Sequence, residues 1–290
     1  MKRIILYGFL LVFTLPVFGQ FLDISGYVDW RRMEMKASVN VNLVEEGIRL
    51  PTGRIHAEMT ISDKYPHLIR THLLAIPVDS SSRVVDLLNR GEITLAGTDA
   101  ISLSAGKVAP ALSADLEVMS VNYTLNLNNL SSFLVMHSRT RDPIRVLTPT
   151  PVTEYTGIVI LAHEELPIHG RHSSAFVIPC LFPKIWDTNM NLIYERNMVD
   201  PQNARAMVKY VPPESVFMRT PSGIDDELAE IVGRNPLRII ARGVFGINPT
   251  DPIIDRSDAL LILSSEHNRR LLREGRVAII IHNSMLITSF

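Results

Sequence analysis

Two stretches of unbroken apolar–polar alternation constrain the fold of this chain more than any other feature. From Met33 to Leu43 every second residue is apolar and the residues between are polar, and residues 117–127 repeat the pattern from Met119 onward. A period of two places successive side chains on opposite faces of a strand. Each stretch therefore predicts a strand with one buried and one polar face, as is typical of an antiparallel sheet.

Between these strands the apolar period becomes helical. Apolar residues recur at helical spacing over residues 52–76 and Pro77 ends the run, while Pro66 inside it predicts a kink or a break into two helices. Residues 80–82, all serine, could cap a second helix that ends near Gly91. A hairpin-like contribution is expected over residues 100–112. Residues 20–137 are thus predicted to form an N-terminal α/β unit.

A proline-rich segment, residues 138–153, is predicted to be a linker to a second α/β unit over residues 154–290. Helices are expected over Asp225–Val232 and Ser257–Arg273, the second with a break at Ser264-Ser265. Buried strands are expected over 157–162, 176–182, 191–194, 237–241 and 277–281, the last apolar on both faces as in a central strand. The predicted fold class is α+β: two strand-rich units with mainly antiparallel or mixed sheets and flanking helices.

The first residues have the layout of a secretory signal peptide. Lys2 and Arg3 precede an apolar run over residues 4–12, and a small residue, Gly19, stands before Gln20. We expect residues 1–19 to be cleaved near Gly19-Gln20, with an uncleaved anchor as the alternative. No cysteine directly follows the apolar run, so the usual lipid-attachment site of a bacterial lipoprotein is missing. The predicted location is therefore periplasmic, without a lipid anchor.

Composition narrows the possible partners. The chain has 29 basic and 30 acidic side chains, and removal of Lys2 and Arg3 leaves a net charge of −3. This balance argues against a nucleic-acid-binding protein, which would need a basic face. A hydrophobic content of 46% indicates a folded chain. No segment of the mature chain approaches the ~18 apolar residues of a membrane span.

Cys180 is the only cysteine, and it lies in an apolar run. An internal disulfide is therefore impossible, and we interpret the thiol as buried and inert. The Gly-x-Ser-x-Gly, Walker and His-Glu-x-x-His motifs are absent. Residues 242–246 contain two glycines without the spacing of a dinucleotide-binding loop. No cofactor is predicted.

Two groups of residues are candidate binding sites. His163, His169 and His172 could hold zinc or copper, although their spacing matches no closed motif and a solvated polar loop is the alternative. Phe182 and Trp186 lie in a rigid proline-flanked segment that either packs on the sheet or forms an exposed recognition strip.

The chain resembles uncharacterised exported envelope proteins of spirochaetes over most of residues 50–285. The resemblance rests on Tyr155 to Ile160, Phe182-Pro-Lys-Ile185, Asn191 to Tyr194, Gly233-Arg-Asn-Pro-Leu237 and Leu271 to Ile281. A weaker resemblance, carried by Gly53-Arg54 to Val78-Asp79-Ser80, is to small surface-lipoprotein and flagellar assembly protein T N-terminal families. These resemblances imply an envelope role of assembly or scaffolding type and transfer no active site.

The leading hypothesis is a non-enzymatic periplasmic protein that binds another envelope protein or a second copy of itself, linked to the flagellar or cell-wall apparatus. One alternative is a periplasmic hydrolase or a metal-dependent enzyme built on the three histidines. Another is a small-ligand or glycan-binding module that uses Phe182 and Trp186.

Overall fold

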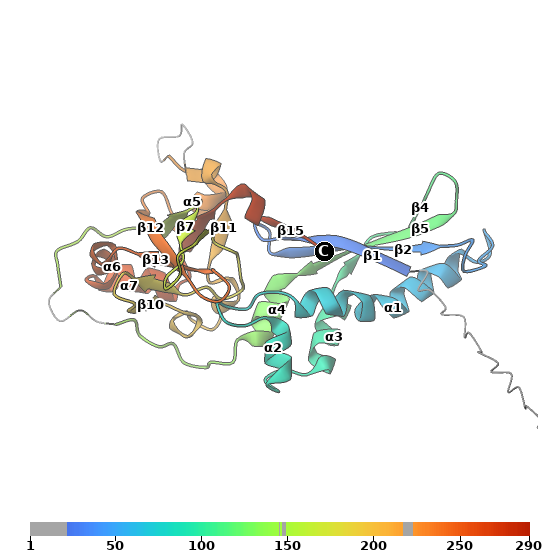
Figure 1. The fold of residues 1–290 in the computed structure, drawn as a ribbon, viewed down its shortest axis with the longest axis horizontal. Helices are drawn as coiled ribbons and strands as arrows, with labels where there is room; N and C mark the ends of the chain where they lie inside the picture. The colour runs from blue at the N-terminus through green and yellow to red at the C-terminus, as the bar shows by residue number, and fades with distance from the viewer. Residues whose placement is uncertain (1–21, 145, 147–148, 217–222) are drawn as a thin grey trace, which may run out of the picture.

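The computed structural model describes residues 22–144, 146, 149–216 and 223–290, and the predicted signal peptide lies outside these residues. The described chain forms two units side by side, each built on a sheet with helices (Figure 1). The predicted α+β class is confirmed. None of the described helices is both long enough and apolar enough to cross a membrane.

The first sheet contains both strands that the alternation predicted. β2 (Glu34–Asn42) and β5 (Val118–Asn126) pair antiparallel, with Val39 opposite Val121. Their side chains alternate between buried and at least partly exposed, as the sequence pattern requires. The strand order is β15-β1-β2-β5-β3, with β4 also pairing with β5. The remaining strands are β1 (Leu22–Asp29), β3 (Gly106–Lys107), β4 (Ala111–Leu112) and β15 (Ile287–Ser289).

Helix α1 (Arg54–Leu74) covers one face of this sheet. Its buried residues recur every four positions and include Ile61, Tyr65 and Ile69, and the Tyr65 ring stacks on that of Tyr123 with centroids 3.7 Å apart. The helix continues through Pro66, so the predicted alternative of two helices is wrong. Buried neighbours on either side of the proline hold both turns against the sheet, which offsets the lost backbone hydrogen bond.

Three short helices complete the first unit: α2 (Val84–Asn89), α3 (Leu95–Leu103) and α4 (Leu127–Leu134). The sequence predicted α2 and its end near Gly91, which has a φ of +73°. Its N-terminus differs from the prediction because Arg83 is the cap residue, with its backbone N–H bonded to the Asp86 carboxylate at 2.7 Å. Between residues 100 and 112, β3 and β4 pair with β5 rather than with each other.

The second sheet has the order β10-β9-β13-β12-β6-β14-β11. The strands β12, β6, β14 and β11 are parallel, and β14 lies between β6 and β11 with every residue buried, as predicted for a central strand. The bounds are β6 (Ile158–Ala162), β9 (Ile185–Asp187), β10 (Leu192–Tyr194), β11 (Lys209–Val211), β12 (Leu237–Phe245), β13 (Asp251–Ile254) and β14 (Val277–Ile281), with β7 (Leu166–Pro167) and β8 (Ser174–Ala175) as a separate pair.

The strand predicted over residues 176–182 is wrong, because this segment is irregular. Pro179 and Pro183 lack N–H groups and cannot complete a strand ladder. The segment instead bonds to both units: Ile178 N donates to Pro249 O at 2.9 Å and Leu181 N donates to Pro77 O at 3.1 Å.

The helices of the second unit follow the prediction closely. α5 (Asp226–Val232) begins after Asp225, whose carboxylate accepts from Leu228 N at 2.7 Å. α6 (Arg256–Leu263) and α7 (Glu266–Arg273) are separated at the predicted serine pair. Single 3-10 turns occur at Arg196–Met198, Ala204–Ala206, Pro213–Val216 and Asn283–Met285.

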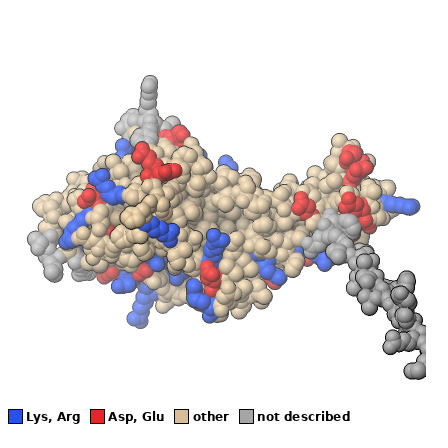
Figure 2. Space-filling view, viewed as in Figure 1, with Lys and Arg blue, Asp and Glu red and all other residues tan. Residues whose placement is uncertain are grey.

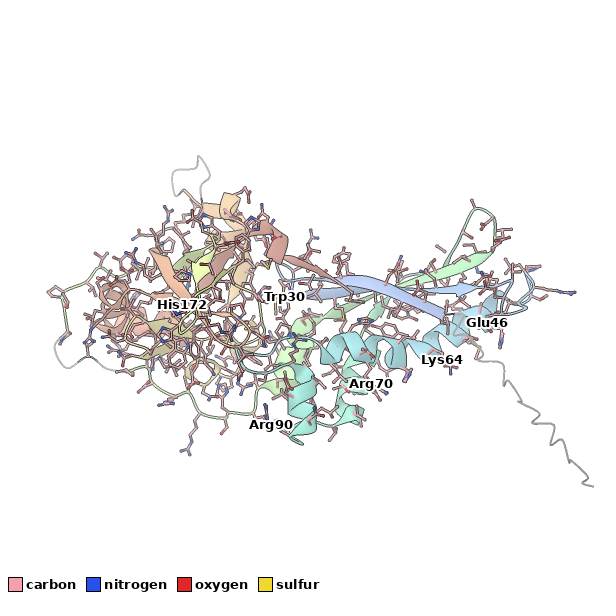
Figure 3. The ribbon with its side chains drawn as sticks, in the orientation of Figure 1. Trp30, Glu46, Lys64, Arg70, Arg90 and His172 are labelled. Carbon is pink, nitrogen blue, oxygen red and sulfur yellow. The ribbon has the colours of Figure 1, made fainter. Side chains whose placement is uncertain are left out.

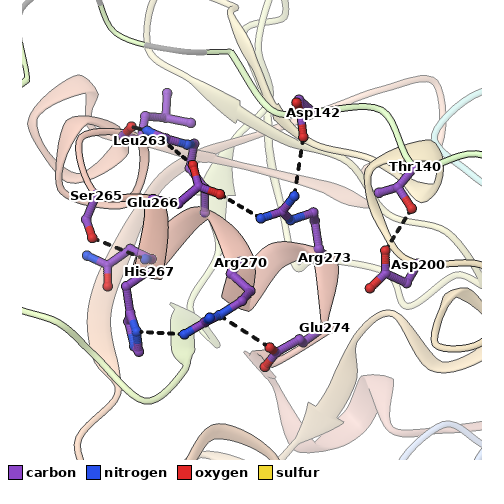
Figure 4. A network of polar contacts seen from close by, with 12 residues as sticks. Thr140, Asp142, Asp200, Leu263, Ser265, Glu266, His267, Arg270, Arg273 and Glu274 are labelled. Atoms are coloured by element: carbon purple, nitrogen blue, oxygen red, sulfur yellow. Dashed lines mark hydrogen bonds and ion pairs between the residues drawn. The ribbon is translucent and has the colours of Figure 1, made fainter.

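The segment predicted as a linker has no regular element among its described residues, yet it is bonded to the second unit. Thr140 Oγ1 donates to Asp200 Oδ1 at 2.7 Å, and Arg273 pairs with Asp142 at 3.5 Å and with Glu266 at 2.7 Å (Figure 4). These contacts fix the path of the chain between the two units.

The last strand returns to the first sheet. β15 pairs antiparallel with β1, with Tyr27 opposite Ser289 and Val28 opposite Thr288. The region expected to form the second unit, residues 154–290, therefore contributes its final residues to the first, and Figure 1 shows β15 running from one unit into the other.

Candidate functional site

The three histidines of the predicted metal site lie at different levels of exposure. His163 is half-buried at the end of β6, while His169 and His172 are exposed in the turn between β7 and β8. The His169 ring lies beside Phe245, with centroids 6.0 Å apart. Among the residues that the structure describes, no group of three or more His, Cys, Asp or Glu side chains is placed to hold a metal ion. The three imidazoles are not gathered into a ligand set.

Phe182 and Trp186 do not form a continuous exposed strip. Phe182 is 3% exposed, and the guanidinium carbon of Arg196 lies 4.7 Å from its ring centroid. Trp186 is half-buried on β9, edge-on to Phe245 at 5.6 Å. Trp186 is the partly exposed residue of β9, between buried Ile185 and buried Asp187, and Phe182 is buried in the proline-flanked loop before that strand.

Cys180 is fully buried, as the sequence predicted. Its backbone N–H donates to the Tyr210 hydroxyl at 3.1 Å, and that hydroxyl donates to the Cys180 carbonyl at 3.0 Å. Burial raises the pKa of the thiol far above its usual value. A protonated, inaccessible thiol is unsuited to nucleophilic chemistry.

A buried acid, Asp251, joins the two units. Its Oδ1 accepts from Lys184 N at 3.1 Å and from the Thr250 hydroxyl at 2.8 Å. Its Oδ2 accepts from Trp186 Nε1 at 3.3 Å, and Ser80 of the first unit adds a side-chain hydrogen bond. Burial raises the pKa of Asp251, and these donors offset part of that effect. Buried carboxylates need such partners.

The loop of residues 78–82 docks onto the second unit through its backbone. Val78 O accepts from Phe182 N at 2.8 Å, and Ser80 O accepts from Asn248 N at 3.0 Å. Gly246, with a φ of +123°, permits this approach because a Cβ there would lie 2.4 Å from the Ser80 Cβ. The Val78-Asp79-Ser80 element of the weaker resemblance thus has a structural role in joining the units.

Asp79 stabilises the same loop from within. Its carboxylate accepts from the backbone N–H groups of Ser81 and Ser82, both at 2.9 Å, and from both hydroxyls. Burial alone would raise the pKa of Asp79, but these hydrogen bonds lower it below the usual value. The hydroxyls of Ser81 and Ser82 therefore bond to Asp79 and do not cap the following helix α2.

The face of the first sheet opposite α1 is open. Figure 1 shows α1 along one side of β1, β2 and β5 and no described element along the other. Three rows of side chains cross the three strands here. The rows are Asp23–Asn40–Ser120, Ser25–Ser38–Asn122 and Tyr27–Lys36–Thr124, and we call these nine residues the open face.

The open face is polar but carries little charge. Asp23 and Lys36 are its charged members, with opposite signs, and Lys36 pairs with Glu34 at 3.4 Å. A groove of about 560 Å³ crosses it, lined in part by Ser25, Ser38 and Asn122. Hydroxyl and amide groups both donate and accept hydrogen bonds, so the face suits a neutral polar partner.

The sequence predicted two of the three strands that carry the open face and missed β1. The sequence does contain a strand pattern for β1, because apolar Leu22, Ile24 and Val28 alternate with polar or amphipathic residues. Gly26 interrupts that alternation at the position where the Phe290 ring packs, 2.7 Å from where a Cβ would lie.

Charges on the rest of the molecule are interspersed. Figure 2 shows Lys and Arg mixed with Asp and Glu over the second unit, without a basic stripe on the face in view.

Comparisons with protein families match most of the chain. The family model of the Treponema pallidum Tp0624 N-terminal domain matches residues 22–133, and that of the Tp0624 second domain matches residues 157–283. The interval between the matches encloses the segment predicted as a linker. No curated protein matches the chain. Neither family match bears on the weaker resemblance to surface-lipoprotein and flagellar families, which stays a prediction. The chain belongs to the spirochaete protein family that Tp0624 represents.

Proposed function

We propose that this chain is an exported, non-enzymatic envelope protein that acts in scaffolding or assembly, and that its open face binds another envelope protein or a second copy of the chain. The observation that carries the proposal is the uncovered polar face with its shallow groove. The expected signal peptide, without a lipid-attachment cysteine, supports a periplasmic location.

The side chains of the open face suit protein contacts. Serine, threonine and asparagine have few rotatable bonds, so ordering them costs little conformational entropy. Tyr27, 36% exposed, adds a rigid aromatic surface with a hydroxyl at its tip. Such residues also dominate adaptable natural binding surfaces.

The contacts that join the two units also support a scaffolding role. The Asp251 cluster, the docked 78–82 loop and the β15 pairing all connect the units, so a partner bound at the first sheet would be held at a fixed position relative to the second.

Site-specific photo-crosslinking in cells tests the proposal. A photo-crosslinking amino acid is placed at Ser38 on the open face and, as the matched control, at His56, which is exposed on α1. We expect one discrete product from Ser38 and none from His56. A product of twice the chain mass indicates self-association, and any other discrete mass identifies a partner protein. Monomer alone at Ser38, or the same product at both positions, would overturn the proposal.

A further inference from the structure

A pocket of about 300 Å³ lies where the two units meet. Figure 3 places Trp30 in this region, between the second unit and the first sheet. The walls come from both units: the end of β1, the C-terminal end of α1, β15, and the segments at Ile178-Pro179 and Asn248. Interfaces between units are common positions for small-molecule sites, which occupy ~300–1,000 Å³. The volume suits a small ligand.

Flat rings form much of the wall. His72 and Phe290 stack with centroids 4.1 Å apart and planes at 23°. Trp30 is 2% exposed, and its Nε1 donates to Thr288 Oγ1 at 3.3 Å, which fixes the indole plane. Pro77 and Pro179 add two further rigid rings. Such walls favour a planar apolar body, which contacts aromatic faces and edges without ordering flexible side chains.

Arg83 gives the pocket its charge. It is exposed, no Asp or Glu is among the lining residues, and it forms no ion pair with a described residue. The Asp86 carboxylate nearby accepts from the Arg83 backbone N–H. Burial lowers the pKa of His72, which disfavours the charged form of that imidazole. Arg83 is thus a cationic residue in the lining of a largely apolar pocket, and a guanidinium can bind a carboxylate through two parallel hydrogen bonds.

We propose that this junction pocket binds a small aromatic carboxylate, with the ring between Trp30 and the His72–Phe290 pair and the carboxylate at Arg83. The pocket lies at the junction and not on the open face, so the inference stands apart from the proposed partner binding.

Ligand-observed NMR on the purified full chain tests the site with two probes, phenylacetate and its neutral isostere phenylacetamide. We expect saturable binding of phenylacetate. Arg83→Gln should weaken it about tenfold or more, because a hydrogen bond to a charged group is lost. Phenylacetamide affinity should change less than twofold in the same variant.

Two further variants separate the pocket from the general surface charge. Ala75 lines the pocket and is itself exposed, so Ala75→Leu should fill the space without disturbing the core and abolish binding of both probes. Arg90→Gln, a change of the same kind at the C-terminal end of α2, should leave both affinities unchanged. Arg83→Lys, which keeps the charge, should retain most of the phenylacetate binding.

Circular dichroism melting first establishes that each variant is folded. The proposal is overturned if phenylacetate shows no saturable binding to the parent chain. It is also overturned if Arg83→Gln and Arg90→Gln have equal effects, or if the folded Ala75→Leu variant still binds either probe.

Discussion

The indole N–H of Trp186 donates a hydrogen bond to the buried carboxylate of Asp251 across 3.3 Å. A ring that the sequence offered as a ligand platform thus supports the buried cluster that connects the two units. The Asp251 carboxylate also accepts a side-chain hydrogen bond from Ser80 of the first unit. The Trp186–Asp251 hydrogen bond therefore lies where the two units are joined.

Trp186→Ala should lower the free energy of unfolding by roughly 3 kcal/mol, because it leaves a cavity beside Phe245 and removes a donor from a buried acid. Trp186→Phe keeps an aromatic ring beside Phe245 and should lose about 1–2 kcal/mol, mainly the hydrogen bond. Urea unfolding followed by circular dichroism measures both. An alanine variant as stable as the parent chain would refute this role.

Asp79→Asn should destabilise the chain more at pH 7 than at pH 3. The folded-state pKa of Asp79 lies below its unfolded value. Its contribution to stability is therefore present above the unfolded pKa of about 3.9 and is lost as the pH falls through the folded pKa. Denaturant unfolding at both pH values gives the two differences, and a difference independent of pH would contradict the assignment. Asp63→Asn, at an exposed position of α1, is the control for general acid effects.

Neighbouring residues of β2 should differ sharply in their tolerance of charge. Val39 is fully buried against α1, so Val39→Lys should cost more than 3 kcal/mol or prevent folding. Ser38 lies on the open face, so Ser38→Lys should change stability by no more than about 0.5 kcal/mol. Thermal melting compares the pair, and equal loss at both positions would contradict the two-faced sheet.

Cys180 should be unreactive in the native chain. Its thiol is buried and its pKa is raised, so a disulfide reagent such as dithiobis-nitrobenzoate should release thionitrobenzoate only after denaturant is added. Rapid labelling of the native chain at neutral pH would show instead that the segment around Cys180 opens readily.

What could be predicted from the sequence was local. The alternation of β2 and β5, the helix α5 and the break between α6 and α7 each depend on a few neighbouring residues, and each prediction is confirmed. The irregular path of residues 176–182 depends on carbonyl groups of Pro77, Val78 and Pro249, which are remote in sequence. No periodicity in the segment itself could have revealed those partners.

The candidate sites also divide into features that neighbouring residues determine and features that depend on residues remote in sequence. The polar side chains of β2 and β5 on the open face could be read from the alternation, because side-chain direction in a strand follows from position. The junction pocket could not, since its walls come from segments as distant as Trp30 and Thr288, which are 258 residues apart. The three histidines, although close in sequence, are not part of any metal-binding group among the described residues: His163 is half-buried at the end of β6, while His169 and His172 are exposed in the turn that follows β7.

The pairing of β15 with β1 also sets an order of events during biosynthesis. A chain made from its N-terminus leaves one edge of β1 uncovered while the whole second unit is being synthesised, and bare strand edges are templates for aggregation. Closing so long a loop by diffusion alone is entropically costly. Folding of the second unit shortens that search, because β14 and the turn after it deliver residues 287–289 close to their partner. Folding of the second unit thereby favours the covering of that β1 edge.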